Sequence, residues 1–394
     1  MDLSVVAVGD GACSVAYADA PSDDLVMDCG AGTNPAATAP ADKLLEELVS
    51  RKQRQWLPQE LLVTHFDADH WGGLARLPIQ AQAYKLQGHS LGLKGPKRVT
   101  IFYPRFPRPA APLGVAMVAH ALIGTALQGG PFFDLVSAWK KAGAKVTLIP
   151  LCRGDSFCGP DEPWNVYWPP KDTDSLSAKS RIAIDTVVEE LQLLVVRSGL
   201  VRLAYAAART SELFTEIGEQ TALRGTGVEE NELEGMPLGS MALQIRLREL
   251  ASQEEMTGDD PYWDGALWNR VRKYNNALSL VVSNCTGTFL NFGDCEGASL
   301  NKLLQLGICP GLTPHDTIRP LVLLAPHHGT QKPGKTFESL FPDANDIVLQ
   351  NGVQHSQKLR SKRLFYNTKS SNSVLETYGP VFTNPLCTHF FQNL

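Results

Sequence analysis

The residues best suited to chemistry form one short run, 61–73, with the sequence LLVTHFDADHWGG. Three apolar residues indicate the end of a buried strand. The polar residues that follow can bind a divalent cation or orient a ligand that does: Thr64, His65, Asp67, Asp69 and His70. Because residues two apart in an extended chain point the same way, His65 and Asp67 can face one ion. Imidazole and carboxylate ligands together suit zinc, and also manganese or iron. A polar loop of hydrogen-bonded histidines is the alternative, and four candidate ligands within six residues argue against it.

A second group of candidates is the pair His327 and His328, which follows an expected apolar strand at 321–325. The chain has only nine histidines, so two adjacent ones at a strand end indicate a site rather than a surface accident. One is expected to bind metal and the other to contact or protonate the substrate. The sequence does not decide between them, and we take His327 as the ligand and His328 as the substrate contact.

The segment THFDADHWGG resembles the H-x-[HD]-x-D-H motif of the metallo-β-lactamase superfamily, including the pair of small residues behind it. Asp67 in place of the second histidine, the HHG at 327–329 and the VYWPP at 166–170 resemble the hydrolase domain of ComEC-type DNA-uptake proteins and their soluble relatives. The resemblance implies an α/β fold, the αββα metallo-β-lactamase sandwich, in which two facing sheets are covered by helices. It also implies a metal centre at the sheet edges, built from both halves of the chain.

The resemblance further implies roles for individual residues. An aspartate at the position of Asp28 supports the run 61–73, called the metal loop below, without touching the ion. The alternative is that Asp28 is an ordinary carboxylate in a turn. Asp294 stands where the superfamily has the aspartate that bridges two ions, although it can also cap the helix expected at 299–306. A histidine at the position of His355 lies near the site, either as a phosphate contact or as an ordinary surface residue. The expected metal ligands are His65, Asp67, Asp69, His70, Asp294 and His327. The expected catalytic residues are Asp69, His328 and His355.

One departure from the superfamily pattern concerns the metal. Many superfamily hydrolases have a further histidine ligand between the first motif and the bridging aspartate, and His89 and His120 lack the strand-end context of such a ligand. Because Asp67 also replaces a histidine, the site has more oxygen ligands than that of a zinc β-lactamase. This difference argues against hydrolysis of β-lactam antibiotics. We expect one or two divalent ions, with zinc first and manganese as the alternative.

The apolar pattern divides the chain into three parts. Residues 172–265 are rich in Ala, Leu, Glu and Arg at helical spacing, which predicts a helical insertion between the two halves of the sandwich, 1–171 and 266–394. The insertion can serve as a lid, as a surface for self-association or as a dock for a protein partner. Within the first half, a short helix is expected to end near Arg76, followed by an irregular, basic, proline-rich run to Pro112.

The start of the chain, MDLSVVAVGDG, lacks the basic region of a signal peptide, and its eight cysteines include no CxxC pair. These features predict a cytoplasmic protein with reduced thiols. No stretch reaches the ~20 apolar residues of a membrane span, so we expect no membrane association.

Charge is distributed unevenly along the chain, although the formal net charge is only −5. No acidic residue lies between His70 and Phe133, and the basic residues of this stretch are Arg76, Lys85, Lys94, Lys97, Arg98, Arg105 and Arg108. A second acid-free stretch spans 347–375. Such asymmetry indicates an anionic substrate, a nucleic acid or a nucleotide. We therefore expect a metal-dependent hydrolase, a phosphodiesterase or nuclease that uses a metal-bound hydroxide. The alternatives are a hydrolase of a small molecule, such as a cyclic nucleotide or another ester, and a scaffold that binds a partner through the insertion.

Overall fold

The structure is a computed structural model that describes residues 1–20, 23–31, 40–50, 57–86, 94–128, 135–214, 240–257, 265–295, 297–306, 320–329, 346–350, 373–376 and 389–392. These residues form two compact units. The first consists of 1–105, 139–170 and the part of the chain from 276 onward, and the second of 106–138 and 171–275.

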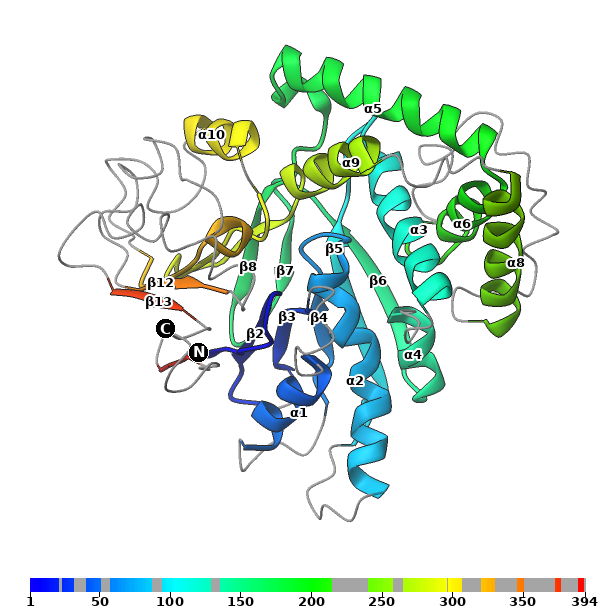
Figure 1. Cartoon of the computed structure of the whole chain (residues 1–394). Helices are drawn as coiled ribbons and strands as arrows, with labels where there is room; N and C mark the ends of the chain where they lie inside the picture. Colours follow the sequence, from blue (N-terminus) through cyan, green and yellow to red (C-terminus); the bar gives the residue numbers. More distant parts are fainter. Residues whose placement is uncertain are drawn as a thin grey trace, which may run out of the picture. The chain divides into compact units, whose positions relative to one another are not determined.

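The first unit contains two seven-stranded sheets (Figure 1). The first sheet has the order β14-β1-β2-β3-β4-β5-β6, with the bounds His389–Phe391, Asp2–Val5, Cys13–Tyr17, Leu25–Cys29, Glu60–Leu62, Arg98–Pro104 and Lys145–Leu151. The second has the order β13-β12-β11-β10-β9-β8-β7, with the bounds Ser373–Glu376, Asp346–Leu349, Val322–Leu324, Phe289–Asn291, Val281–Asn284, Pro163–Trp168 and Ser156–Cys158.

Both sheets repeat one pairing pattern. Strands β14, β1, β2 and β3 pair antiparallel, and β3, β4, β5 and β6 pair parallel. In the second sheet, β7 to β10 pair antiparallel and β10 to β13 pair parallel. Because parallel strands run the same way, the carboxyl ends of β3, β4, β5 and β6 lie at one edge of the first sheet.

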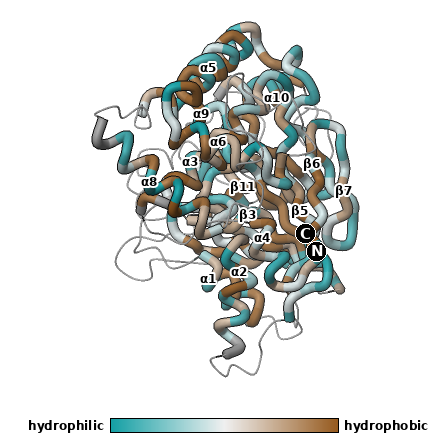
Figure 2. The backbone as a smooth tube through the Cα atoms, turned by 90° about the vertical axis from the view of Figure 1, so that its right-hand side faces the viewer, coloured by the Kyte–Doolittle hydropathy of each residue, from teal (hydrophilic) through white to brown (hydrophobic). Residues whose placement is uncertain are grey.

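The two sheets share one hydrophobic core. In β1, Leu3 and Val5 belong to this core, while Ser4 points the other way and donates a 2.6 Å hydrogen bond to Glu47 of helix α1 (Pro40–Ser50). The core also includes Phe102 of the first sheet and Val282 of the second. Because residues from both sheets pack together, the sheets face each other. The apolar strands are among the brown segments of the tube in Figure 2. The expected mixed α/β architecture with two sheets is therefore confirmed.

Helices α1 and α2 (Ala68–Leu86) pack together and against β3. Helix α10 (Gly297–Leu306) follows β10, and the 3-10 turn η5 (Pro326–Gly329) follows β11. Two local expectations were wrong. Helix α2 does not end near Arg76, because buried Leu74, Leu77 and Ala81 continue its apolar face past Pro78. The run after it, which was expected to be irregular, contains β5, whose last four residues are all buried; prolines at and beside its ends conceal the strand in the sequence.

The second unit is helical in the part that the structure describes. Its helices are α3 (Ala111–Gln128), most of α4 (Leu135–Lys141), α5 (Ala178–Arg197), α6 (Gly199–Arg209), α8 (Met241–Thr257) and α9 (Gly265–Ala277), with the short helix η2 (Thr173–Ser175). Glu254 of α8 caps the start of α6 by accepting hydrogen bonds from Ser198 Oγ at 2.8 Å and from the Leu200 N–H at 2.9 Å. Arg270 of α9 pairs with Glu190 of α5.

The helical unit is larger than the insertion expected at 172–265, because α3 packs against α6 and α8. The division of the chain into two sandwich halves and an insertion stays a prediction. No single helix in the described ranges is both long and apolar enough to cross a membrane; α5 and α6 pass that test only as a pair bent by 116°.

Candidate metal centre

The metal loop begins where β4 ends and finishes in the first turn of α2. Pairing with β5 continues past β4, because the Val63 N–H donates to the Phe102 carbonyl at 2.8 Å. The loop is held from behind by the β1–β2 turn, where the Ala12 N–H donates to the Asp69 carbonyl at 3.1 Å. Gly30 lies so close that a Cβ there would sit 2.3 Å from the carbonyl carbon of Asp69. A glycine is therefore required at 30 for the loop to dock.

Asp28, at the end of β3, holds the loop and one of its histidines. Its Oδ1 accepts the Thr64 N–H at 2.8 Å, and its Oδ2 accepts the Thr64 hydroxyl at 2.8 Å. Oδ2 also lies 3.0 Å from Nδ1 of His70, so Nδ1 carries the proton and Nε2 presents a lone pair. A carboxylate behind an imidazole is the usual device for orienting a metal-binding histidine.

His65 is also held through its Nδ1 atom, in this case by two hydroxyl groups. Its Nδ1 lies 3.3 Å from Thr64 Oγ1 and 3.4 Å from Ser279 Oγ. Because Thr64 Oγ1 donates its proton to Asp28, it accepts from His65, and Nε2 of His65 is again the nitrogen with the lone pair. That atom is fully buried and has no hydrogen-bond partner among the described residues.

Asp294 reaches the site from the second sheet, just after β10. Its N–H donates to Ser279 Oγ at 3.1 Å, and Asn276 Nδ2 donates to its Oδ2 at 3.4 Å. Gly293 precedes it with φ +47, and a Cβ there would lie 2.5 Å from Ser279 Oγ. Only glycine combines this backbone conformation with this close approach.

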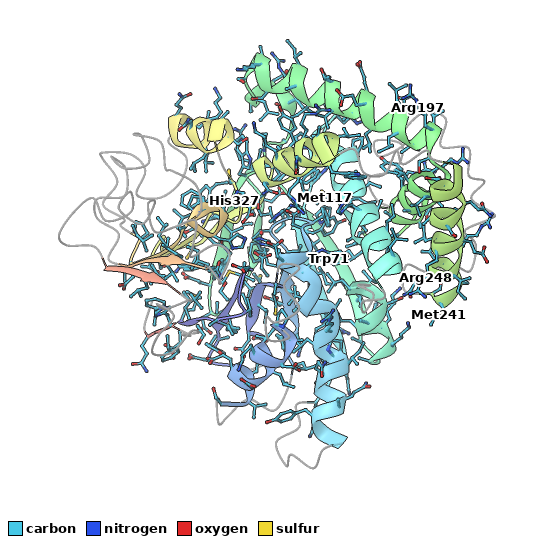
Figure 3. The ribbon with its side chains drawn as sticks, viewed as in Figure 1. Trp71, Met117, Arg197, Met241, Arg248 and His327 are labelled. Carbon is cyan, nitrogen blue, oxygen red and sulfur yellow. The ribbon has the colours of Figure 1, made fainter. Side chains whose placement is uncertain are left out.

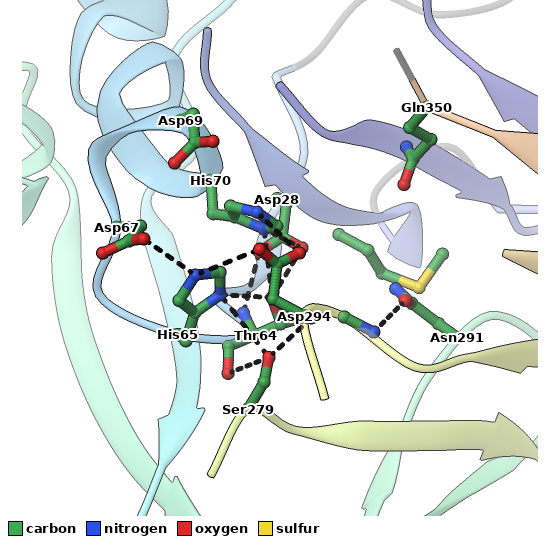
Figure 4. Close-up of polar contacts among 12 residues, drawn as sticks. Asp28, Thr64, His65, Asp67, Asp69, His70, Ser279, Asn291, Asp294 and Gln350 are labelled. Carbon is green, nitrogen blue, oxygen red and sulfur yellow. Dashed lines mark hydrogen bonds and ion pairs between the residues drawn. The ribbon is translucent and has the colours of Figure 1, made fainter. Parts of the chain in front are cut away.

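The two carboxylate oxygens of Asp294 face different imidazoles. Oδ1 lies 3.2 Å from Nε2 of His70 and 3.7 Å from Nε2 of His328. Oδ2 lies 3.8 Å from Nε2 of His65 and 3.8 Å from Nε2 of His327. Asp67 approaches the His65 side, with its Oδ2 3.6 Å from His65 Nε2 (Figure 4).

Both histidines of the second group reach the site, on a strained turn. His327 and His328 have φ of 49 and 55, and Gly329 continues the left-handed run with φ 73. Such backbone conformations cost free energy in non-glycine residues and are concentrated at functional sites. His328 is buried, and its Nε2 lies 3.3 Å from Nε2 of His70 and 3.5 Å from Oδ2 of Asp69. The side chain of His327 (labelled in Figure 3) is 25% exposed, and that of Asp69 is 24% exposed.

These atoms form a candidate metal centre. Two overlapping groups each place three ligand atoms within 4.8 Å of one another: His65, His70 and Asp294, and Asp69, His70 and His328. The Nε2 atoms of His65 and His70 lie 3.8 and 3.2 Å from the two carboxylate oxygens of Asp294, close enough for each imidazole to bind a cation together with that carboxylate. A cation between them satisfies the buried Nε2 of His65, so the residues fit a divalent metal.

The pKa shifts of His70 and Asp294 also indicate that this site favours positive charge. Burial lowers the pKa of His70, but the carboxylates of Asp294 and Asp28 outweigh burial and raise it well above its usual value. Burial raises the pKa of Asp294, but the surrounding imidazoles, His328 first, hold it well below its usual value. Metal ions replace such protons, because ligands must be deprotonated to coordinate.

Comparisons with known proteins give little beyond this geometry. No family model matches the chain, and no curated protein matches it. Among solved structures, the metallo-β-lactamase fold protein YhfI from Bacillus subtilis is similar at 12% identity, with a TM-score of 0.23. The similarity covers 42% of this chain and 52% of that protein, about half of its length. A likeness at this level establishes neither a family nor an activity.

The structure brings together most of the residues that the sequence nominated. His65, Asp67, Asp69, His70, Asp294, His327 and His328 all have atoms in the contacts above. His355 lies outside the described residues, so its role stays a prediction. The choice of His327 as ligand and His328 as substrate contact also stays a prediction, although burial and distance favour the reverse. The contacts of Asn276 and Ser279 with Asp294 were not predicted from the sequence; the polar residues that interrupt the apolar run at 275–283 were the available signal.

Proposed function

We propose that the protein is a metal-dependent hydrolase of phosphodiester bonds, and that its substrate is a nucleic acid. The observation that carries the proposal is the placement of Asp294, whose two oxygens face separate imidazole groups at 3.2–3.8 Å. A carboxylate so placed suits two cations, one on each side, and two-cation sites are widespread among enzymes that cleave phosphate esters.

The proposed ligands divide between the two sides of Asp294. His65 and Asp67 would hold one cation together with Asp294, and His70, His328 and Asp69 would hold the other, also together with Asp294. We propose zinc or manganese, because the ligand set mixes imidazole with several carboxylates. When bound, zinc would lower the pKa of a bound water to about 7, and either cation would neutralise the charge of a phosphate group.

The remaining roles belong to side chains of this chain. Asp28 and Thr64 fix the protonation of His65 and His70 before any substrate arrives. His327 is the more exposed of the two adjacent histidines, so we assign it the substrate contact, a proton donated to the departing oxygen. His328, which is buried among the ligand atoms, takes the metal. The resemblance of the metal loop to the metallo-β-lactamase motif agrees with a hydrolase and supports the αββα sandwich, as does its likeness to the ComEC-type hydrolase domain.

A cleavage screen tests this function. The protein is stripped with EDTA, reloaded with zinc or manganese, and offered single-stranded DNA, duplex DNA, RNA, a cyclic dinucleotide and bis(p-nitrophenyl) phosphate. We expect metal-dependent cleavage of a polynucleotide and of the generic diester, and none by Asp294→Ala. Cleavage of the cyclic dinucleotide alone would replace the nucleic acid by a small-molecule substrate. Stoichiometrically metal-loaded protein that cleaves no diester would refute the hydrolase and favour a scaffold.

A further inference from the structure

The first sheet places two arginines along the same edge as the metal loop. The loop follows the carboxyl end of β4, Arg105 follows that of β5, and Arg153 lies two residues beyond β6. Since β4, β5 and β6 are parallel neighbours, these three chain segments leave the sheet at one edge. Ligand sites of parallel sheets commonly lie outside the carboxyl ends of the strands.

The strand register fixes the order and spacing of these positions. Leu62 pairs with Phe102 in the last printed pair of β4 and β5, so His65 and Arg105 each follow this pair by three residues. Pairing between β5 and β6 persists to this level, because the Arg105 N–H donates to the Leu151 carbonyl at 2.8 Å. Neighbouring strands lie ~4.8 Å apart, so the carboxyl ends of β5 and β6, which Arg105 and Arg153 follow, are one and two strand spacings from that of β4.

We propose that Arg105 and Arg153 bind successive phosphates of a linear polynucleotide whose scissile phosphate lies at the metal centre. The proposal rests on the hydrolase function above and specifies its substrate as an extended chain rather than a cyclic nucleotide. Arg105 is exposed and Arg153 is half-buried. Arginine suits this task because its planar guanidinium binds phosphate oxygens in pairs and is always charged. Phosphates repeat every ~3.4 Å along the axis of B-form DNA and lie farther apart in an extended single strand of nucleic acid. This repeat is similar to the ~4.8 Å spacing between neighbouring β-strands.

The basic residues at the other end of β5 do not share this position. Lys97 and Arg98 lie at the opposite end of β5, where Arg98 pairs with Lys145 at the start of β6. A seven-residue strand is roughly 20 Å long, so Arg98 is separated from Arg105 by that distance. The acid-free region therefore does not form one surface beside the metal loop. Arg98→Ala thus serves as a matched control, because it removes the same charge from the opposite end of β5.

Binding and kinetics test the proposal separately from the hydrolase function. Anisotropy of a fluorescein-labelled thymidylate octanucleotide is followed in EDTA as salt is raised, for the parent, Arg105→Ala, Arg153→Ala, Arg105→Lys and Arg98→Ala. Each lost phosphate contact should flatten the logarithmic salt slope by ~0.7 for a single strand. We expect this flattening for both alanine variants at the edge, and a parental slope for Arg98→Ala and Arg105→Lys.

With manganese-loaded protein, Arg105→Ala and Arg153→Ala should raise KM for the octanucleotide with kcat little changed. The loss should be larger for the octanucleotide than for a dinucleotide, and Arg98→Ala should lose nothing. Equal effects of Arg98→Ala and Arg105→Ala, or no effect of either edge variant, would overturn the inference while leaving the hydrolase standing. Absence of diester cleavage by the parent would instead refute the hydrolase, and the salt slopes in EDTA would still decide whether the edge binds phosphate.

Discussion

Thr64→Val removes one hydroxyl group from the centre of the hydrogen-bond network and leaves the shape of the side chain unchanged. The Thr64 Oγ1 lies 2.8 Å from Asp28 Oδ2, 3.3 Å from His65 Nδ1 and 3.2 Å from His70 Nδ1, and all four residues are buried. Deleting it leaves a buried carboxylate oxygen with one partner fewer and His65 with a weaker constraint. An unsatisfied buried polar group costs ~1–3 kcal/mol, so the metal-free protein should lose about that free energy of unfolding.

The same change should weaken metal binding. Groups that orient metal-binding histidines are typically worth ~10–100-fold in affinity, or ~1.4–2.8 kcal/mol. The assay is zinc competition against a chromophoric chelator, with urea unfolding of the metal-free protein in parallel. Thr64→Ser keeps the hydroxyl and should bind zinc nearly as the parent does. A folded Thr64→Val that binds zinc as tightly as the parent would refute the role of this hydroxyl.

Three further predictions concern single positions. Burial raises the pKa of Glu60 to about 7, with Asp23 adding to the effect, so its folded-state pKa exceeds its ordinary value of 4.5. The contribution of Glu60 to stability is therefore full below pH 4.5 and is lost as pH rises through 7. Glu60→Gln should raise the free energy of unfolding at pH 8 by ~1–2 kcal/mol after allowance for solvent screening, with no gain at pH 4. An equal gain at both pH values would contradict this pKa assignment. Gly293→Ala should cost ~2–4 kcal/mol in urea unfolding, because it combines a left-handed backbone with a close contact, and a change below measurement error would be inconsistent with that geometry. His328→Ala should lose metal, whereas His327→Ala should keep metal and lose turnover; metal content and initial rates separate the two, and the opposite pattern would restore the assignment made from sequence.

The metal loop was predictable because its information is local. A buried strand end, four ligand types in six residues and a following glycine pair all lie within the run 61–73. The structure places this run directly after β4, as expected, but α2 begins at Ala68 rather than at the glycine pair, so Asp69 and His70 lie in its first turn. Asp294 and the two histidines were also foreseeable, because each follows an apolar strand of its own.

Contacts between distant segments were not predictable in the same way. Ser279 Oγ contacts the Thr64 carbonyl across 215 positions of sequence, and no pattern near either residue indicates the other. Strand β14, near the end of the chain, pairs with β1. Strand β5 was concealed by flanking prolines, and the position of Lys97 and Arg98 followed only from its register. The distribution of charge along the chain therefore predicted an anionic substrate, but it did not show which lysine and arginine side chains lie near the metal centre.

Metal content of the purified protein is the most direct test of a two-cation centre around Asp294. The protein is dialysed to equilibrium against zinc or manganese, separated from free metal, and measured by plasma mass spectrometry, beside Asp294→Ala and the exposed-site control Asp174→Ala. We expect about two equivalents in the parent and in the control, because each oxygen of Asp294 faces its own imidazole groups, and little or none in Asp294→Ala. A parent that binds neither metal, or an Asp294→Ala variant that retains the full amount, would contradict it.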